Sequence, residues 1–533
     1  MPLAYPAADV WTLLADIADE TPDAPAFIHG ERTLSFAELL DCSARAAQGL
    51  ADLGVGPGDR VALWLPNVPA YPILYFACAR LGAIAVAVNT RYRAVEVAEI
   101  VGRSGAKVLA CAPGFRRIDF LPILAEIDPA ALDRLAAIVT VGEEPASVPA
   151  VLERLRRVPF ERLVSRPRCA INHALASAPC NIFTTSGTTS APKFVLHRQG
   201  AIAGHAQQVA RSFGFAAPET LSLAILPLCG VFGFNQTLAT LAAGRPSVLV
   251  ESYEIEEIAR LIVRHKPTTM FGSDDMYARL LDLVPGRWPF RSIKWAGYAA
   301  FNASLEDLPE RAQPRGLRLT GLYGMSEVQA LYARQPLNMP VGRRKLGGGI
   351  PTSPLGHVRV RDPETGELLG PGRPGALECA GPSLMVGYYG NDKATAEAMT
   401  PDGYVRTGDL AELDGKGGFT FLSRMGDVLR LSGFLTNPLE IETHIQKLPA
   451  IAACQTIAVA RPEGVRAVSF VVLAPGATLD EAAVIAHCKH GLANYKVPLR
   501  VFAVDDFPRT PSANGLKIQL GKLREMAERL LST

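Results

Sequence analysis

One short stretch of the chain carries the residue types that a polyphosphate would need. Between two apolar runs, residues 183–197 place a series of hydroxyl side chains around Gly187, followed by a proline and Lys193. Hydroxyls can donate to several phosphate oxygens at once, and a lysine adds a mobile cation. The apolar runs predict two strands joined by this loop, so the stretch is a candidate phosphate-binding hairpin.

Two simpler interpretations compete with that one. A lone run of serine and threonine is more often an ordinary polar turn. A P-loop shares the glycine and the lysine, but its motif requires Gly-Lys-[Ser/Thr]. Here Pro192, Lys193 and Phe194 follow one another instead, so the P-loop interpretation fails.

The loop does resemble the phosphate loop of the adenylate-forming superfamily, which includes acyl-CoA synthetases, luciferases and peptide-synthetase adenylation domains. The family pattern is roughly Thr-Ser-Gly-[Ser/Thr]-Thr-Gly-x-Pro-Lys-Gly. The positions that agree are Thr185, Ser186, Gly187, Thr188, Thr189, Pro192 and Lys193. Ser190 and Phe194 stand where the family usually has glycine. The resemblance implies that Thr188 is catalytic and that the other matching hydroxyls, Gly187 and Lys193 bind the nucleotide.

A second motif follows residues 317–320 of a predicted strand. Gly321 to Glu327 resembles the family's Tyr-Gly-x-[Thr/Ser]-Glu motif. An aromatic ring at a strand end can stack on adenine, and a nearby carboxylate can hold Mg²⁺ against phosphate oxygens. The resemblance implies nucleotide binding by Tyr323, Gly324 and Ser326, with Glu327 as a catalytic residue and metal ligand.

Two further motifs supply a carboxylate and a lysine. Residues 404–409 resemble the family's Arg-Thr-Gly-Asp motif, which makes Asp409 the candidate acceptor for both ribose hydroxyls. Arg424 is the expected second ribose or phosphate contact. Residues 507–519 are similar to the catalytic-lysine motif, although Leu516 lengthens the spacing before Lys517. An ammonium group there would stabilise developing charge electrostatically; Lys522 is a weaker rival.

The resemblance also marks where the acid and the thiol would bind. Residues 227–233 match the acyl-pocket motif, with glycine at a position where histidine or an aromatic residue is common. That glycine either enlarges the cavity or admits a close backbone approach. Residues 296–300 occupy the place of a small-residue loop that lines adenine and the acid. The implied acyl-pocket residues are Gly230, Val231, Phe232, Gly233 and Ala299; Tyr298 is assigned to the nucleotide, and Arg430 and Gly433 to CoA.

The elements that must position these residues alternate between strand and helix. Strands are predicted at 61–65, 83–88, 221–228, 247–250, 268–271, 293–299 and 317–323, and helices within 32–60 and at 70–81 and 255–264. This alternation predicts an α/β fold with parallel-rich sheets, whose ligands collect at the carboxyl ends of the strands. Residues 361–375 are turn-rich and predict a small β subdomain.

The sequence predicts a boundary near residue 425. Beyond it, strands at 456–460, 468–473 and 500–504 and a helix at 481–490 predict a small α+β domain. We therefore expect an N-terminal domain over 1–424, a hinge at 425–426 and a mobile C-terminal domain over 427–533. In the family, the C-terminal domain rotates about such a hinge between two half-reactions.

Composition narrows the class of protein. The 54 Lys+Arg residues nearly balance the 52 Asp+Glu residues, which gives no signal for nucleic-acid binding. The nine cysteines form no CxxC pair, as is typical of reduced thiols in a cytoplasmic protein. We expect neither a membrane span nor a secretory signal. Whether the chain forms a homodimer stays open.

The motifs together predict an AMP-forming acyl-CoA ligase that uses ATP, Mg²⁺ and coenzyme A. The apolar residues near 230 favour a fatty, alicyclic or aryl acid over a charged one. Two alternatives stay open: a carrier-protein thiol as acceptor, and a protein weak in adenylation that converts preformed acyl-AMP. A nucleotide-binding protein without catalysis is disfavoured, because both Glu327 and Lys517 are present.

Overall fold

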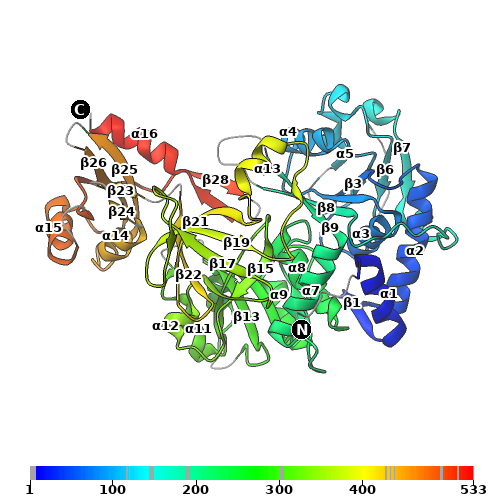
Figure 1. Cartoon of the computed structure of the whole chain (residues 1–533), viewed down its shortest axis with the longest axis horizontal. Coiled ribbons are helices and arrows are strands. Elements are labelled where there is room, and N and C mark those ends of the chain that lie inside the picture. The colour runs from blue at the N-terminus through cyan, green and yellow to red at the C-terminus, as the bar shows by residue number, and fades with distance from the viewer. Residues whose placement is uncertain are drawn as a thin grey trace.

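The computed structural model describes residues 8–115, 118, 120–142, 149–185, 192–286, 289–300, 305–425, 429–431, 434–436, 438–461, 464–492, 496–512 and 515–531. For Arg430 and Lys517 it describes the backbone alone. Figure 1 shows a large part, coloured blue through yellow, and a smaller C-terminal part, coloured orange to red, at the left. The predicted α/β class with a smaller α+β C-terminal part is confirmed.

The first sheet has eight strands and carries the candidate phosphate loop. Its strands, in spatial order, are β20 (Gly387–Tyr388), β9 (Phe194–Arg198), β8 (Pro179–Thr184), β4 (Ile84–Ala87), β3 (Arg60–Trp64), β5 (Val108–Cys111), β6 (Ala137–Thr140) and β7 (Arg156–Pro159). The strands from β8 to β7 are parallel, whereas β9 and β20 are antiparallel to their neighbours. On β3, Val61 and Leu63 face one core and Ala62 and Trp64 face another. Burial on both faces explains the continuous apolar sequence of this strand.

The second sheet has fourteen strands and is mixed. Its order is β18 (Leu368–Leu369), β17 (His357–Arg361), β19 (Gly375–Ala380), β21 (Val405–Leu413), β22 (Phe419–Arg424), β16 (Gly348–Pro351), β15 (Gln329–Arg334), β14 (Leu319–Met325), β13 (Trp295–Ala299), β12 (Thr269–Ser273), β10 (Ser222–Ala224), β11 (Ser247–Leu249), β1 (Pro25–His29) and β2 (Arg32–Ser35). The run from β14 to β1 is parallel. The predicted small β subdomain is the antiparallel half of this same sheet.

Helices cover both sheets, and several begin where the sequence predicts. The helix α2 (Phe36–Asp52) starts with a capping box between Ser35 and Glu38, and α3 spans Ala70–Leu81 as expected. The other helices of the large part are α1 (Val10–Glu20), α4 (Ala94–Val97), α5 (Phe120–Ala125), α6 (Phe160–Val164), α7 (Gln199–Phe213), α8 (Val231–Ala242), α9 (Ile255–His265), α10 (Asp274–Leu283), α11 (Leu308–Ala312), α12 (Val341–Arg344) and α13 (Asp392–Ala398). A π-helical turn, η1 (Ala98–Gly102), follows α4; the 3-10 turns are η2 (Pro129–Leu132), η3 (Ala150–Leu152) and η5 (Gln313–Arg315).

The C-terminal part is a separate α+β arrangement. Its strands are β23 (Leu429–Leu431), β24 (Phe434–Thr436), β25 (Ile451–Arg461), β26 (Gly464–Leu473), β27 (Arg500–Ala503), β28 (Arg509–Ser512) and β29 (Gly515–Ile518), and its helices are α14 (Pro438–Ile445), α15 (Glu481–Gly491) and α16 (Leu520–Leu530). Its buried apolar residues form two clusters, one of which includes Leu429 and Cys488 and the other Phe470 and Leu523. In Figure 1, β28 extends from this part toward the middle of the molecule.

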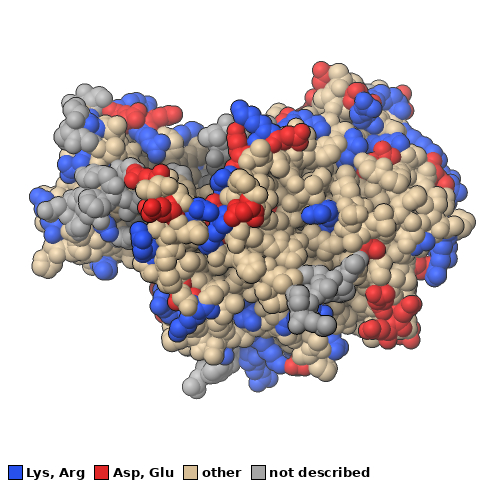
Figure 2. Space-filling view, viewed as in Figure 1, with Lys and Arg blue, Asp and Glu red and all other residues tan. Residues whose placement is uncertain are grey.

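The surface agrees with the balanced composition. Figure 2 shows Lys and Arg intermingled with Asp and Glu on the face in view, without a continuous field of one sign. Among the residues that the structure describes, no helix is long and apolar enough to cross a lipid bilayer.

Candidate active site

The candidate phosphate loop joins two antiparallel strands, as predicted. The strands β8 and β9 pair in register up to Thr184 opposite Phe194, and the N–H of Thr185 donates to the carbonyl of Lys193 at 3.0 Å. These contacts bring the two ends of the loop together. The predicted loop residues Ser186, Gly187, Thr188, Thr189 and Ser190 lie outside the described residues, so their roles stay predictions.

Phe194, which replaces a family glycine, packs into the protein core. Its side chain is 2% exposed and belongs to the apolar cluster that includes Trp64. The guanidinium of Arg103, which follows η1, lies 4.8 Å from the centre of the Phe194 ring and donates to the carbonyl of Pro192 at 3.3 Å. The phenyl ring is therefore held within packed side chains and not in open space beside Lys193.

Lys193 and Glu327 are linked through a tyrosine. The Nζ atom of Lys193 lies 4.7 Å from the centre of the Tyr388 ring, and the Tyr388 hydroxyl donates to Oε1 of Glu327 at 2.8 Å. Tyr388 lies on β20 opposite Val195 of β9, directly beside the candidate phosphate loop. Burial, and then the Glu327 carboxylate, raise the pKa of the Tyr388 phenol, so this hydroxyl keeps its proton at neutral pH.

Glu327 lies in a turn between β14 and β15 whose backbone is closely packed. A Cβ atom at Gly324 would lie 2.5 Å from the Cα atom of Ala330, so only glycine fits there. Gln329 has a φ of 66°, which is unusual for a residue other than glycine. Its buried amide accepts from Asn235 at 2.9 Å and donates to the carbonyl of Ala201 at 3.1 Å. These bonds fix the turn against α7 and α8.

A buried histidine supports the same turn. The Nε2 atom of His197 lies 2.7 Å from the carbonyl oxygen of Ser326, and since a carbonyl only accepts, we assign the proton to Nε2. Burial lowers the pKa of His197 to about 4, so the ring is neutral at physiological pH. Ser326 is therefore held through its backbone, next to the carboxylate of Glu327.

Asp409 and Tyr323, which come from two different motifs, are in direct contact. The Tyr323 hydroxyl donates to Oδ2 of Asp409 at 2.5 Å, and Arg424 Nε lies 3.2 Å from Oδ1. Asp409 and Arg424 are direct partners in the β21–β22 register. The Asp409 side chain is 3% exposed, whereas that of Arg424 is 53% exposed. A nearly buried carboxylate beside an accessible guanidinium can serve as an acceptor for ribose hydroxyls.

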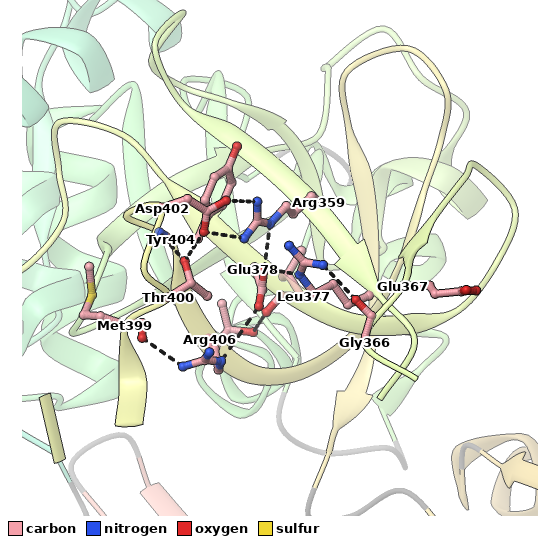
Figure 3. A network of polar contacts seen from close by, with 12 residues as sticks. Arg359, Gly366, Glu367, Leu377, Glu378, Met399, Thr400, Asp402, Tyr404 and Arg406 are labelled. Carbon is pink, nitrogen blue, oxygen red and sulfur yellow. Dashed lines mark hydrogen bonds and ion pairs between the residues drawn. The ribbon is translucent and has the colours of Figure 1, made fainter. Parts of the chain in front are cut away.

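Strand β21, which carries Asp409, is held by the charged network in Figure 3. The 5%-exposed carboxylate of Glu378 lies 2.6 Å from Arg359, 3.0 Å from Arg361 and 3.9 Å from Arg406. Asp402 also accepts from both terminal nitrogens of Arg359, and this pairing keeps the pKa of Asp402 well below its usual value. Arg406 lies in the same motif as Asp409, so the network contacts β21 at this motif.

The strand β13 pairs with β14, the strand that carries Tyr323. A Cβ atom at Gly297 would lie 2.7 Å from Leu322, which explains why that position must be small. The Tyr298 side chain is buried, and its hydroxyl donates to the carbonyl of Lys345 at 2.6 Å. Ala299 is half-buried at the carboxyl end of the strand. A nucleotide contact by Tyr298 and an acyl contact by Ala299 stay predictions.

The acyl-pocket motif forms the start of α8. Among the residues that the structure describes, a Cβ atom at Gly230 would meet only the carbonyl of Pro227 at 3.4 Å, an ordinary contact, so this glycine leaves space on that side. At Gly233, a Cβ atom would lie 2.5 Å from the same carbonyl, so the close backbone approach occurs there. Val231 and Phe232 are half-buried next to these glycines. Asn67 donates to the carbonyls of Ala224 and Leu226 and holds the preceding segment in place.

The remaining predicted residues belong to the C-terminal part. Lys517 lies on β29, opposite Thr510 of β28, in a two-stranded hairpin. Its rival Lys522 is exposed in the first turn of α16. Arg430 lies on β23, whereas Gly433 and the hinge residue Gly426 lie outside the described residues. The Met425 N–H donates to the carbonyl of Gly408 at 2.7 Å. The domain boundaries and the role of Lys517 therefore remain proposals.

The carboxylate of Glu327 is a donor group of the kind that binds magnesium. Within the described ranges, no group of three His, Cys, Asp or Glu residues could hold an ion. Glu327 has one oxygen bonded to Tyr388, and no described residue donates to its Oε2 atom. Magnesium typically takes one or two carboxylates and completes its shell with water and substrate phosphates. Glu327 could hold Mg²⁺ in this manner.

Sequence reasoning missed three residues that organise the site: Tyr388, His197 and Gln329. Tyr388 follows Gly387 in an otherwise ordinary apolar segment, and only strand pairing reveals its contact with Glu327. His197 ends the segment 183–197, and nothing in its local sequence indicates the contact with Ser326. Gln329 lies two residues beyond Glu327, and nothing in its local sequence indicates a positive φ.

Known proteins match this chain along nearly its whole length. Residues 14–389 match the family described as AMP-binding enzyme, and residues 440–514 match its C-terminal domain. The chain is 31% identical to 3-[(3aS,4S,7aS)-7a-methyl-1,5-dioxo-octahydro-1H-inden-4-yl]propanoyl:CoA ligase of Mycobacterium tuberculosis, over 95% of this chain and 96% of that protein. It is 30% identical to feruloyl-CoA synthase of an Amycolatopsis species, over 93% and 95% of the two proteins.

The fold comparison agrees with the sequence comparison. The crystal structure of ATP-bound MatB from Rhodopseudomonas palustris superposes with a TM-score of 0.82 at 26% identity, covering 97% of this chain and 99% of that one. The motifs from Thr185 to Lys517 thus lie in a chain whose full length follows the family. The chain belongs to the AMP-binding enzyme family and, within it, to the AMP-forming acid–CoA ligases.

Proposed function

We propose that this acyl-CoA ligase activates an apolar carboxylic acid, fatty, alicyclic or aryl, with ATP and transfers it to coenzyme A. In the first half-reaction a carboxylate oxygen attacks the α-phosphorus, the bond to the bridging oxygen breaks, and pyrophosphate leaves. In the second, the thiol sulfur attacks the acyl carbon, the bond to the phosphate oxygen breaks, and AMP leaves. Bound Mg²⁺ would neutralise charge on the phosphate oxygens.

The observation that carries this proposal is the position of the β14–β15 turn. Four residues apart, Tyr323 contacts Asp409 and Glu327 reaches Lys193 through Tyr388. The β14–β15 region therefore contacts Asp409, the candidate acceptor for ribose, and is linked through Tyr388 to Lys193 at the end of the candidate phosphate loop. This spacing supports an extended nucleotide along the turn, with its sugar at Asp409 and its phosphates toward Lys193.

The acyl end of the site supports an apolar substrate. Among the described residues, Gly230 leaves space at the start of α8, where the apolar side chains of Val231 and Phe232 follow it and are half-buried. Two relatives are named for acids with ring systems. Apolar surroundings disfavour a substrate with a second charge, since burying an unpaired charge is costly.

A panel of acids tests the proposal. The purified protein is incubated with ATP, Mg²⁺ and one acid at a time, with and without CoA, and AMP and pyrophosphate are measured. The panel contains medium-chain fatty acids, alicyclic and aryl acids, and a short dicarboxylic acid as the charged contrast. We expect AMP release and thioester formation with an apolar acid and CoA. Turnover confined to the dicarboxylic acid, or none with any acid, would contradict the proposal.

The two alternatives make different predictions in the same assay. If a carrier-protein thiol were the acceptor, acyl-AMP would form but free CoA would not capture it. If adenylation were weak, the protein would convert supplied acyl-AMP to acyl-CoA but release little pyrophosphate from acid and ATP. The burial of Phe194 disfavours weak adenylation, because its ring packs among core side chains such as Trp64.

A further inference from the structure

Tyr388 connects two parts of the candidate site that come from distant segments of the chain. Its hydroxyl donates to Oε1 of Glu327 at 2.8 Å, and its ring lies 4.7 Å from Nζ of Lys193. Tyr388 and Glu327 are each 6% exposed. One side chain therefore touches both the candidate metal carboxylate and the candidate phosphate lysine.

The backbone around Tyr388 is fixed to the same two segments. The N–H groups of Val386 and Tyr389 donate to the carbonyls of Leu196 and Phe194, each at 2.7 Å. The Met385 N–H donates to the carbonyl of Glu327 at 2.8 Å. Residues 385–389 thus bridge the β8–β9 hairpin and the β14–β15 turn through main-chain bonds, and the Tyr388 side chain can move little without disturbing both.

The hydrogen bond from Tyr388 orients the Glu327 carboxylate. A carboxylate has two oxygens, and here the phenol takes Oε1 while no residue within the described part of the chain donates to Oε2. A donor on one oxygen fixes the rotation of the group and leaves the other oxygen available to a cation. Outer partners of this kind orient metal ligands and tune their affinity. The aromatic face holds the Lys193 ammonium nearby through a cation–π contact.

We propose that Tyr388 is a positioning residue for the metal–nucleotide complex. It turns Oε2 of Glu327 toward Mg²⁺ and restrains Lys193 beside the phosphates. This inference rests on the proposed function. Tyr388 itself would touch neither the metal nor the reacting atoms, so its effect is exerted through Glu327 and Lys193.

The full-length Tyr388→Phe variant isolates the hydroxyl and keeps the ring over Lys193. Binding is measured by titration calorimetry with α,β-methylene-ATP plus Mg²⁺, and separately with AMP in the presence of EDTA. We expect the variant to bind the Mg²⁺ complex about tenfold more weakly, in line with the usual effect of removing an outer partner of a metal ligand. AMP binding should be unchanged, and a higher Mg²⁺ concentration should restore binding of the analogue.

Two further variants sharpen the test. Tyr389→Phe makes the same chemical change one residue away and should match the wild type. Tyr388→Leu also removes the aromatic face, and should weaken binding of the analogue even without metal, because Lys193 loses its restraint.

Three outcomes would overturn the inference. An unchanged affinity of Tyr388→Phe for the Mg²⁺ complex removes the role of the hydroxyl. An equal loss of AMP and analogue binding, together with a lower unfolding temperature, indicates a purely structural role. A wild-type protein that binds neither AMP nor the Mg²⁺ complex contradicts the proposed function itself, and the inference falls with it.

Discussion

The hydroxyl of Tyr323 donates a hydrogen bond of 2.5 Å to Oδ2 of Asp409, from the opposite half of the fourteen-stranded sheet. Tyr323 ends the parallel run of this sheet, and Asp409 lies in its antiparallel part. Burial, and then the Asp409 carboxylate, raise the pKa of Tyr323 far above its ordinary value. The phenol therefore stays a donor at all physiological pH values, and it fixes one face of the carboxylate before any nucleotide binds.

Replacing this carboxylate by its neutral isostere tests the ribose role. Asp409→Asn keeps an oxygen for Tyr323 but loses the charge that pairs with Arg424 and would accept ribose hydroxyls. A hydrogen bond to a charged group contributes about 1.5–3 kcal/mol, so we expect AMP to bind roughly 10–100-fold more weakly. Calorimetric titration with AMP checks this. The exposed Asp282→Asn on α10 serves as the control, and equal AMP affinity in all three proteins would rule out the role of Asp409.

The role proposed for Lys517 can be tested by measuring the two half-reactions separately. We expect Lys517→Ala to lower acyl-AMP formation by about two to three orders of magnitude, the usual effect of losing one electrostatic donor. Capture of supplied acyl-AMP by CoA should stay close to the wild-type rate. Pyrophosphate release and thioester formation are measured separately. Lys522→Ala, at an exposed position of α16, should leave both rates unchanged; a comparable loss of both half-reactions in Lys517→Ala would refute its assigned role.

Much of the fold could be predicted because local pattern and burial agree. The helix 70–81 and the strands near 61–65 and 247–250 lie where the sequence places them. The long sheet could not be predicted, since β16 and β22 join its two halves through pairs far apart in sequence, such as Gly348 with Thr420. Hydrophobic periodicity carries no information on such pairing.

The candidate site could be predicted from the sequence only at residues that belong to a recognisable motif. Tyr323, Glu327 and Asp409 belong to such motifs, and in the structure Tyr323 contacts Asp409. Tyr388 reaches Glu327 through the pairing of β20 with β9, a tertiary contact without a local sequence signal. The sequence does not separate the two roles suggested for Gly230, whereas the structure shows space at Gly230 and a close backbone approach at Gly233.

We expect the space at Gly230 to determine how large an acid the enzyme accepts. Its backbone has a φ of −96°, which any residue can adopt, so Gly230→Phe should fold normally. The added ring would reduce the acyl site, and we expect kcat/KM for bulky ring acids to fall about tenfold or more, whereas short acids are spared. Steady-state kinetics over the acid panel measure the ratio of kcat/KM for bulky acids to kcat/KM for short acids in the variant and in the wild type.

A neighbouring glycine provides the structural contrast. Gly233→Ala would place Cβ 2.5 Å from the Pro227 carbonyl oxygen and 2.6 Å from that of Leu226. We expect this overpacking to lower the free energy of unfolding by about 1–3 kcal/mol. Any loss of activity should then be the same for short and bulky acids. If Gly230→Phe loses activity toward short and bulky acids equally, the glycine does not determine substrate size.

Two buried histidines should make stability depend on pH. The pKa values of His197 and His205 are both lowered to about 4 by burial, from an ordinary value near 6.5. The contribution of these neutral, buried rings to the free energy of unfolding is fully present above about pH 6.5. It is lost as the pH falls toward 4, because the unfolded chain then binds more protons than the folded one. Each histidine adds up to about 1.4 kcal/mol per pH unit to this slope.

The urea midpoint measured from pH 7.5 to 4.5 tests this dependence. His205→Gln keeps a donor for the carbonyl of Ala330, which His205 Nε2 contacts at 2.7 Å, but cannot take up a proton. Between pH 6.5 and 4.5, we expect the urea concentration at the unfolding midpoint to fall less for the variant than for the wild type. His490→Gln, on the exposed end of α15, should follow the wild-type curve. The assignment of His205 as a neutral buried ring would be wrong if both variants and the wild type gave parallel curves.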